Sequence, residues 1–188
     1  MAKKALPCPT VLRQLLRYEP ETGKLFWKER AAHWFKESDT VSIETRCRIW
    51  NTRYAGNRAF TRSGDNGYHR GQVFKKDTYA HRVAWTIHHG AWPENDIDHI
   101  NGVRTDNRIS NLRDVTRSVN LQNQRVNARS TSGFTGVSWC KRRSIWRSRI
   151  FVGGKEVTLG TFAKIEDAVM ARAQADKKYG FHENHGRE

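Results

Sequence analysis

The spacing of apolar residues changes along the first half of the chain, from a helical period to the alternation of a strand. Residues 10–18, TVLRQLLRY, carry apolar side chains at helical spacing, with Thr10 placed to cap the helix. A proline and a glycine then predict a turn before a short strand at 25–28. Residues 29–55 show no clear period, so helix and loop both remain open there.

The middle of the chain has stronger signals. Between residues 56 and 79, Gly, Asn and Asp separate short runs, which predicts a small antiparallel sheet. HRVAWTIHH at 81–89 predicts a helix that Gly90 ends. The segment DIDHINGVRTDNRISNLRDVTRSVNLQN at 96–123 predicts strand, loop, strand and helix in that order.

The pattern changes after residue 122. Residues 122–136 are rich in Asn, Ser, Thr and Gly, which predicts the end of a helix followed by a linker. Beyond the linker, two or three strands with a Gly153-Gly154 turn precede an Ala-rich helix. We therefore expect an α+β chain of three parts: an accessory region at 1–55, a central domain at 56–128 and a C-terminal domain at 129–188.

Composition narrows the choice of partner. The chain has 34 Lys and Arg against 19 Asp and Glu, a net charge of +15. Basic residues interspersed with aromatic ones favour a nucleic acid as partner over a basic protein without a specific ligand. The partner that we expect is double-stranded DNA. Three scattered cysteines indicate neither a disulfide framework nor a cysteine zinc site, and no apolar run is long enough for a membrane span. We expect a cytoplasmic protein that acts on neither membranes nor small molecules.

The residue types needed to cleave a phosphodiester bond occur together at 98–120. Cleavage needs an activated water and stabilisation of negative charge, which an imidazole and an oxygen-ligated divalent cation can supply. Asp98 and His99 offer these side by side, and Asn111 and Asn120 add carboxamides that bind a metal or donate hydrogen bonds. The alternative is local structure alone, with Asp98 and Asn111 capping backbone beside the turn formers Asn101, Gly102, Asp106 and Asn107.

The stretch DHINGVRTDNRISNLR resembles the HNH nuclease family, the ββα-metal fold, in the subgroup of phage-encoded homing endonucleases. The resemblance implies that His99 is the general base and that Asn111 ties the two strands together and orients it. It implies Asp98 and Asn120 as ligands of one divalent ion. Many members have His where this chain has Asn120, and the oxygen-rich shell favours Mg²⁺ or Mn²⁺ over Zn²⁺.

Adjacent strand residues point to opposite faces, which is a difficulty for Asp98 and His99. The two can serve one metal and water only if the strand is irregular there, or if His99 reaches a water beyond the metal. We therefore expect a bend or bulge at this point.

The C-terminal part of the chain has a GV pair at the start of its first strand, an aromatic residue before RSRI, the run LGTF and an Ala-rich helix. In these features residues 133–180 resemble the ethylene-response-factor (APETALA-type) DNA-binding domain, a three-stranded antiparallel sheet with one packed helix. Strand alternation places Trp146, Ser148 and Ile150 towards the helix and Arg147, Arg149 and Phe151 outward. The same rule turns Val137 and Trp139 inward and turns Ser138, Cys140 and Arg142 outward. A module used for protein contacts remains the alternative to DNA binding.

These patterns together predict a metal-dependent DNA endonuclease of the phage HNH type, of homing or nicking specificity, acting in the bacterial host. The central domain would be the nuclease and the C-terminal domain a DNA-binding module. The alternative is a non-catalytic DNA-binding regulator on an HNH scaffold. One site per chain favours a monomer, although the oligomeric state stays open. We predict DNA contacts from Arg104, Arg108, Arg113, Arg117, Arg142, Arg147 and Arg149.

Overall fold

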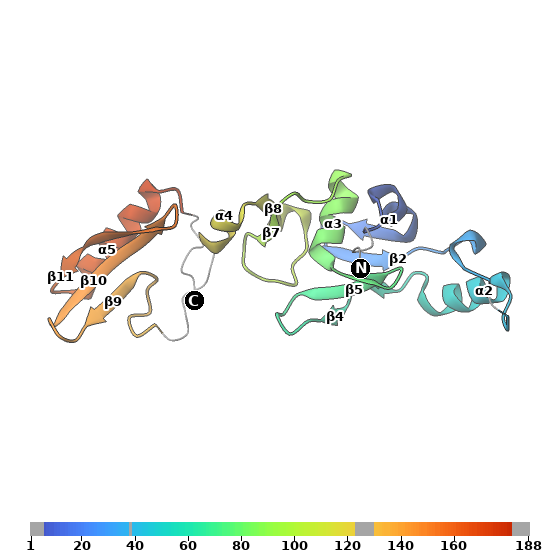
Figure 1. Cartoon of the computed structure of the whole chain (residues 1–188), viewed down its shortest axis with the longest axis horizontal. Coiled ribbons are helices and arrows are strands. Elements are labelled where there is room, and N and C mark those ends of the chain that lie inside the picture. The colour runs from blue at the N-terminus through green and yellow to red at the C-terminus, as the bar shows by residue number, and fades with distance from the viewer. Residues whose placement is uncertain (1–5, 38, 123–129, 182–188) are drawn as a thin grey trace. The chain divides into compact units, whose positions relative to one another are not determined.

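A computed structural model of the chain describes residues 6–37, 39–122 and 130–181 (Figure 1). The chain divides into two compact units. We call them the N-terminal unit, residues 1–99 and 103–114, and the C-terminal unit, residues 100–102 and 115–188. Within the described ranges, no helix is both long and apolar enough to cross a membrane.

The first helix is shorter than the pattern predicts. Helix α1 spans Pro9–Leu15, with Cys8 at its N-cap, so Thr10 lies inside the helix and the predicted cap is wrong. Proline is favoured in a first helical turn because its missing N–H would be unpaired there anyway. The helix ends because Leu16 begins strand β1 (Leu16–Glu19), which pairs antiparallel with β2 (Lys24–Trp27).

Residues 29–55, left open by the sequence, contain a short 3₁₀ helix η1 (Ala32–Trp34) and helix α2 (Ile43–Tyr54). The Ser42 side chain caps α2 by accepting a hydrogen bond from the Thr45 backbone N–H. Strand β3 (Arg58–Ala59) then completes the first sheet, in the order β1-β2-β3.

The predicted antiparallel sheet at 56–79 is present as β4-β5-β6, which comprises Arg62–Ser63, His69–Val73 and Lys76–Tyr79. Helix α3 (Ala80–His89) follows and ends at Gly90, whose φ of 78° is the left-handed conformation expected of a glycine stop. Strands β7 (Asp96–His99) and β8 (Leu112–Val115) form a two-stranded sheet, with a 3₁₀ helix η2 (Ile109–Asn111) before β8.

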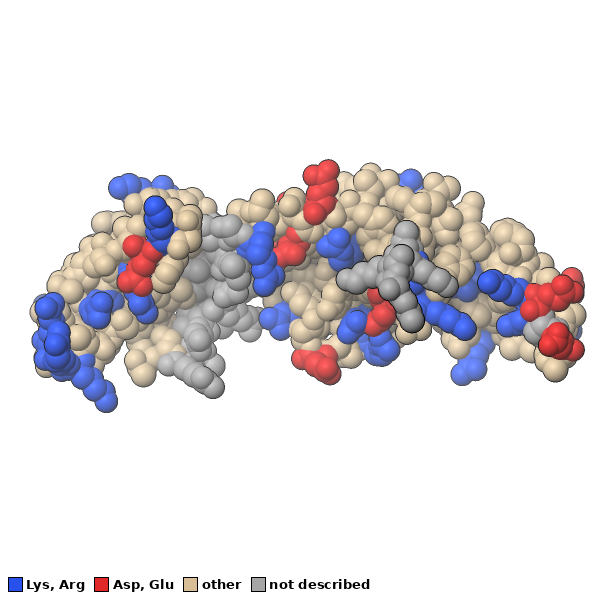
Figure 2. All heavy atoms as spheres, viewed as in Figure 1, with Lys and Arg blue, Asp and Glu red and all other residues tan. Residues whose placement is uncertain are grey.

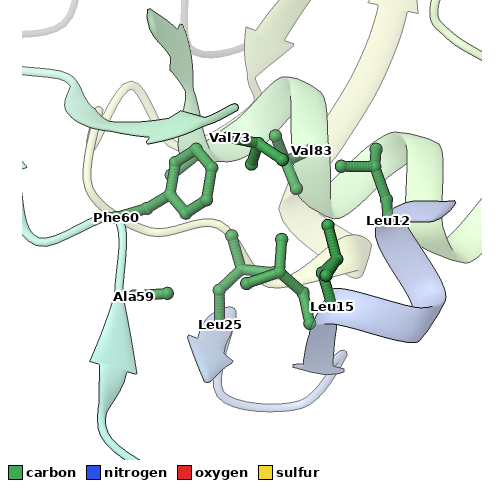
Figure 3. Close-up of a cluster of buried hydrophobic side chains, with 9 residues drawn as sticks. Leu12, Leu15, Leu25, Ala59, Phe60, Val73 and Val83 are labelled. Atoms are coloured by element: carbon green, nitrogen blue, oxygen red, sulfur yellow. The ribbon is translucent and has the colours of Figure 1, made fainter. Parts of the chain in front are cut away.

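The main core of the N-terminal unit combines residues of the sheets β1-β2-β3 and β4-β5-β6 with residues of helices α1 and α3. Figure 3 shows side chains from α1, β2, β3, β5 and α3 converging. A second cluster, Ala84, Ile97 and Leu112, packs α3 against β7 and β8. The predicted accessory region and the predicted central domain therefore contribute to one core. The labelled members of the first cluster are Leu12, Leu15, Leu25, Ala59, Phe60, Val73 and Val83.

The C-terminal unit contains helix α4 (Arg117–Gln122), strands β9 (Val137–Cys140), β10 (Ile145–Val152) and β11 (Lys155–Phe162), and helix α5 (Ile165–Lys178). The strands form an antiparallel sheet in the order β11-β10-β9, and α5 packs on it. This confirms the predicted sheet and helix. Residues 123–129 of the predicted linker lie outside the described residues.

Alternation along β10 is as predicted: Ser148 and Ile150 are buried, whereas Arg147, Arg149 and Phe151 are exposed. On β9, Val137 is buried but Trp139 is exposed and packs on Trp146, with 5.0 Å between ring centroids. Register pairs Trp139 with Trp146, so both lie on the predicted inward face. Trp139 therefore lies on the predicted face of the sheet, but its side chain is exposed.

Arg172 of α5 is buried, although the sequence gives no hint of it. Its Nη1 donates to the Arg149 carbonyl at 2.9 Å and its Nε to Asp176 at 2.9 Å. The Arg149 N–H in turn donates to the Gly136 carbonyl at 2.9 Å, beside a register shift between Ser148 and Arg149. Arg172 therefore fixes the backbone of β10 at its irregular point.

We expect Leu15→Ala to lower the free energy of unfolding by about 2–5 kcal/mol, because Leu15 is fully buried and its loss leaves a cavity. Urea denaturation measures the change. Ile49→Ala is the matched control, since Ile49 is 57% exposed and its truncation should change stability by about 0.5 kcal/mol or less. Equal effects of the two substitutions would contradict this core.

Candidate active site

The end of strand β7 places Asp98 and His99 in buried positions, 7% and 3% exposed. The strand ends at His99 and the chain turns from Ile100 onward. The two side chains have different described neighbours: Asp98 meets an arginine of β8, and His99 meets the side chain of Asn107 and aromatic rings. Whether they serve one metal and one water stays a prediction.

The His99 ring forms a hydrogen bond with Asn107, whose side chain is 3% exposed. The distance from His99 Nε2 to Asn107 Oδ1 is 3.0 Å. An amide oxygen only accepts, so in the neutral ring the proton lies on Nε2 and the lone pair on Nδ1. The sequence identified Asn107 as a turn former. Its spacing from His99 carries no periodic signal that would have predicted this bond.

Asn107 is itself held by the β1-β2 hairpin. The Tyr18 hydroxyl donates to the Asn107 carbonyl at 2.7 Å, and the Ile109 N–H donates to the Pro20 carbonyl at 3.1 Å. Gly23 in the hairpin turn has φ of 70°, and a Cβ there would lie 2.5 Å from the Arg108 backbone nitrogen. The hairpin at residues 16–27 therefore supports the loop that contacts His99.

Aromatic rings from two other elements surround His99. His81 of α3 lies edge-to-face with it, with 5.2 Å between centroids, and Tyr68 lies at 5.6 Å. Tyr79 stacks on His81 at 5.2 Å. Nδ1 of His81 is buried and has no hydrogen-bond partner in the described part of the chain. These contacts restrict the His99 ring without adding a formal charge.

Burial keeps both imidazoles neutral. It lowers the pKa of His81 to about 3, with a further contribution from the neighbouring His99 and Arg82. Burial also lowers the pKa of His99, and the Asn107 hydrogen bond and the Asp98 charge only partly oppose it. A neutral His99 is the form that can accept a proton. The pKa of Tyr18 is raised, first by burial and then by the charges of Asp106 and Glu21, so its hydroxyl stays a donor.

Asp98 forms an ion pair with Arg113 on β8. Arg113 Nε donates to Asp98 Oδ2 at 2.8 Å, and Nη2 lies 2.7 Å from the same oxygen, without the alignment of a second hydrogen bond. A buried carboxylate requires such compensation. Arg113, predicted to contact DNA, thus has its guanidinium against a candidate metal ligand.

Asn111 and Asn120 differ in what the structure shows of them. Asn111 is buried, and its Nδ2 donates to the Asp106 carbonyl at 2.8 Å, which closes the loop that carries Asn107. Asn120 lies on α4, where its N–H donates to the Thr116 carbonyl at 3.0 Å. Because α4 belongs to the C-terminal unit, the approach of Asn120 to Asp98 stays a prediction.

The donor chemistry suits a hard cation, although the described residues contain no group of three or more His, Cys, Asp or Glu side chains that could hold a metal. Mg²⁺ binds through one or two carboxylates and keeps several waters, so Asp98 with a carboxamide oxygen is an adequate protein contribution. The residues present therefore fit a Mg²⁺-type ion and do not fit a structural zinc site.

The predicted DNA-contacting arginines are in varied environments. Arg104 lies over the Tyr68 ring at 5.3 Å and donates to the Asn66 carbonyl. Arg108 forms a two-pronged pair with Asp106, at 2.8 and 2.6 Å. Arg149 pairs with Glu156 at 2.9 Å. Three others, all exposed, are Arg117, Arg142 and Arg147.

A family of known proteins matches the segment that carries the candidate site residues. Residues 78–122, from β6 to α4, match the HNH endonuclease family, so this segment is an HNH endonuclease domain. The match includes Asp98, His99, Asn111 and Asn120, and it supports a nuclease-type function. It ends at residue 122 and so does not bear on the resemblance of 133–180, which stays a prediction.

A wider similarity connects the chain to one phage protein. The chain is 33% identical over 84 residues to Protein 3.8 of Escherichia phage T7, covering 44% of this chain and 69% of that protein. The chain belongs to the same family as Protein 3.8. No solved structure matches it.

We expect the buried neutral His81 to make stability depend on pH. His81 takes up a proton near pH 6.5 in the unfolded state but only near pH 3 in the folded state. Its contribution to the free energy of unfolding is therefore complete above pH 6.5 and is lost as the pH falls towards 3. From pH 7 to pH 5, the protonation of His81 should lower the free energy of unfolding of the wild type by about 2 kcal/mol. The His81→Phe variant should not show this part of the decrease. Urea denaturation at both pH values measures this. The exposed-site variant His88→Phe should behave like the wild type, and an unchanged pH difference in His81→Phe would contradict the assignment.

Asn107→Leu should remove the acceptor of His99 Nε2–H and lower the unfolding free energy by about 1–3 kcal/mol. In metal-free wild type, ¹⁵N NMR of the His99 ring should show the Nε2-protonated tautomer, and in Asn107→Leu the tautomer populations should become mixed. Ser110→Ala, at an exposed position near the same loop, is the control. A wild-type ring protonated on Nδ1 would show that Asn107 does not set the tautomer.

Proposed function

We propose that this chain is a metal-dependent DNA endonuclease that hydrolyses phosphodiester bonds, with homing or nicking specificity. The observation that carries the proposal is the buried, neutral His99, fixed by Asn107 and adjacent to Asp98 within the HNH endonuclease match. Structural caps and turns alone do not require a neutral imidazole at the end of a strand beside a carboxylate.

His99 acts as the general base in this proposal. Its Nδ1 carries the lone pair, because Nε2 holds the proton and donates a hydrogen bond to the Asn107 side-chain oxygen. Nδ1 takes the proton from a water that attacks the phosphorus atom in line with the leaving oxygen. His81 and Tyr68 keep the ring in one orientation by packing against it.

Asp98 and Asn120 would hold one divalent ion, Mg²⁺ or Mn²⁺, whose chemistry is to neutralise charge on the phosphate oxygens. Arg113 contributes by orienting the Asp98 carboxylate through Oδ2. Asn111 contributes by closing the loop between the strands through the Asp106 carbonyl. Arg104, Arg108 and Arg117 would contact the flanking phosphates.

The C-terminal unit would supply affinity and placement on DNA. Its exposed row of Arg147, Arg149 and Phe151 lies on the sheet face opposite α5, as an APETALA-type module would require. Arg142 follows β9 in an exposed turn. Arg149 pairs with Glu156 and would have to exchange this carboxylate for a phosphate on DNA.

With Mg²⁺ we expect purified protein to relax supercoiled plasmid, and a chelator to abolish the reaction. His99→Ala should lower the rate about 10²-fold or more, the usual contribution of a general base. His88→Ala, an exposed histidine of α3, should keep full activity. Agarose gel electrophoresis of the plasmid forms measures all three.

Two results would contradict different parts of the proposal. DNA binding without nicking under every condition would favour the non-catalytic regulator. Nicking by His99→Ala at the wild-type rate would keep the class of protein but exclude His99 as the base.

A further inference from the structure

Helix α2 has no buried residue, yet its inner side is firmly attached to the N-terminal unit. Asn51 accepts from the Arg30 N–H at 2.9 Å and donates to the Arg30 carbonyl at 3.0 Å, and Cys47 Sγ donates to the same carbonyl. Trp50 meets Trp27 edge-to-face, with the Arg30 guanidinium 3.9 Å from the centre of the Trp50 ring. These contacts fix the helix without placing it in the core.

The outer side of α2 has a regular arrangement. At 100° per residue, Ile49 and Thr52 lie opposite the attached side, and Arg48 and Arg53 lie on the two flanks of this strip. All four residues are exposed, Ile49 by 57%. Figure 1 shows α2 away from α1 and α3 in this unit, so neither helix covers it.

Arg48 and Arg53 differ from several arginines of the chain that have a carboxylate partner. Arg62, Arg108 and Arg149 all pair with carboxylates. No ion pair is found for Arg48 or Arg53 among the described residues. Figure 2 does show acidic side chains at the end of the N-terminal unit where Figure 1 places α2. The acidic residues nearest in sequence are Glu37, Asp39 and Glu44.

We propose that α2 enters the major groove of DNA, with Arg48 and Arg53 contacting phosphates on opposite sides of the groove. The groove is about 12 Å wide and admits one α-helix, with a phosphate backbone along each edge. Two guanidinium groups flanking a narrow strip of Ile49 and Thr52 match that geometry. The Arg53 guanidinium lies 5.3 Å from the centre of the adjacent Tyr54 ring, and neither arginine has an ion pair in the described part of the chain. These two cations and the net charge of +15 disfavour a protein partner for the exposed Ile49.

This surface extends the proposed function, since it rests on DNA being the substrate. It assigns a role to a region in which no site residue is predicted, and it lies outside the HNH match at 78–122. Helix α2 would then add contacts on the duplex that the arginines around His99 do not make.

The test is binding of a 40-base-pair duplex by the full chain in chelator, measured by fluorescence anisotropy over a series of salt concentrations. The double variant Arg48→Gln/Arg53→Gln should bind about tenfold more weakly near physiological salt. The slope of log affinity against log salt should fall by about 2, one for each lost phosphate contact. Arg48→Lys/Arg53→Lys should recover most of the affinity, because a point charge suffices for a phosphate.

The matched control is Lys177→Gln/Lys178→Gln, which removes the same charge from the exposed end of α5. It should leave the salt slope nearly unchanged. Equal losses in both double variants would assign the effect to net charge and overturn the α2 surface, as would wild-type affinity in the α2 variant. At equal protein concentration, dimethyl sulfate protection of guanine N7, a major-groove atom, should weaken in the α2 variant and stay unchanged in the α5 control.

The outcome is separable from that of the endonuclease proposal. A wild-type protein that binds DNA but never nicks it contradicts the endonuclease and leaves the α2 comparison intact. A wild-type protein that nicks DNA, with an α2 variant that binds and nicks equally well, contradicts only the α2 surface.

Discussion

The hydrogen bond between Asn107 and His99 is the contact on which the site depends. It is buried, it sets which ring nitrogen holds the proton, and it joins a loop to the end of a strand. That loop has no regular backbone pairing of its own, so other elements must hold it. Tyr18 and Gly23 do so from the N-terminal hairpin, and Asn111 does so from η2. Removing any of these supports would loosen the ring that has to be held in place.

The site and the core are therefore built from the same elements, strand β7 and helix α3. Strand β7 is packed on α3 by Ile97, while the next residues along the strand, Asp98 and His99, carry the polar chemistry. Helix α3 contributes Ala84 to that packing and His81 to the rings around His99. Burying two neutral imidazoles and one paired carboxylate is unfavourable in isolation. The apolar clusters on either side offset that cost, so the polar groups stay in fixed positions.

Elements with a strong local signal could be predicted from the sequence: the helix before Gly90, the two strands around the HNH loop, and the alternating faces of β10. The candidate pair Asp98 and His99 also comes from the sequence, because their chemistry is local, and its catalytic role stays a prediction. The partners of those residues could not be found. Asn107 contacts His99 from within the loop and Tyr18 contacts Asn107 from the N-terminal hairpin, and the spacing of polar residues carries no record of either contact. The same is true in the C-terminal unit of Arg172, whose contacts are with Arg149 and Asp176. Helix α2 lies in the region that the sequence left open between helix and loop, because its attached side has only a few anchoring residues and no apolar stripe.

The hairpin at residues 16–27 has a consequence for the size of the independent unit. The segment that matches the HNH family begins at residue 78, but the Tyr18 hydroxyl and the Gly23 turn lie about sixty and fifty-five positions before it. A fragment cut to the family boundaries would keep His99 and Asn107 and lose the scaffold that holds them. Recombination that exchanged the beginning of this chain for another would therefore have to bring an equivalent hairpin, and the evolutionary module is longer than the motif that identifies it.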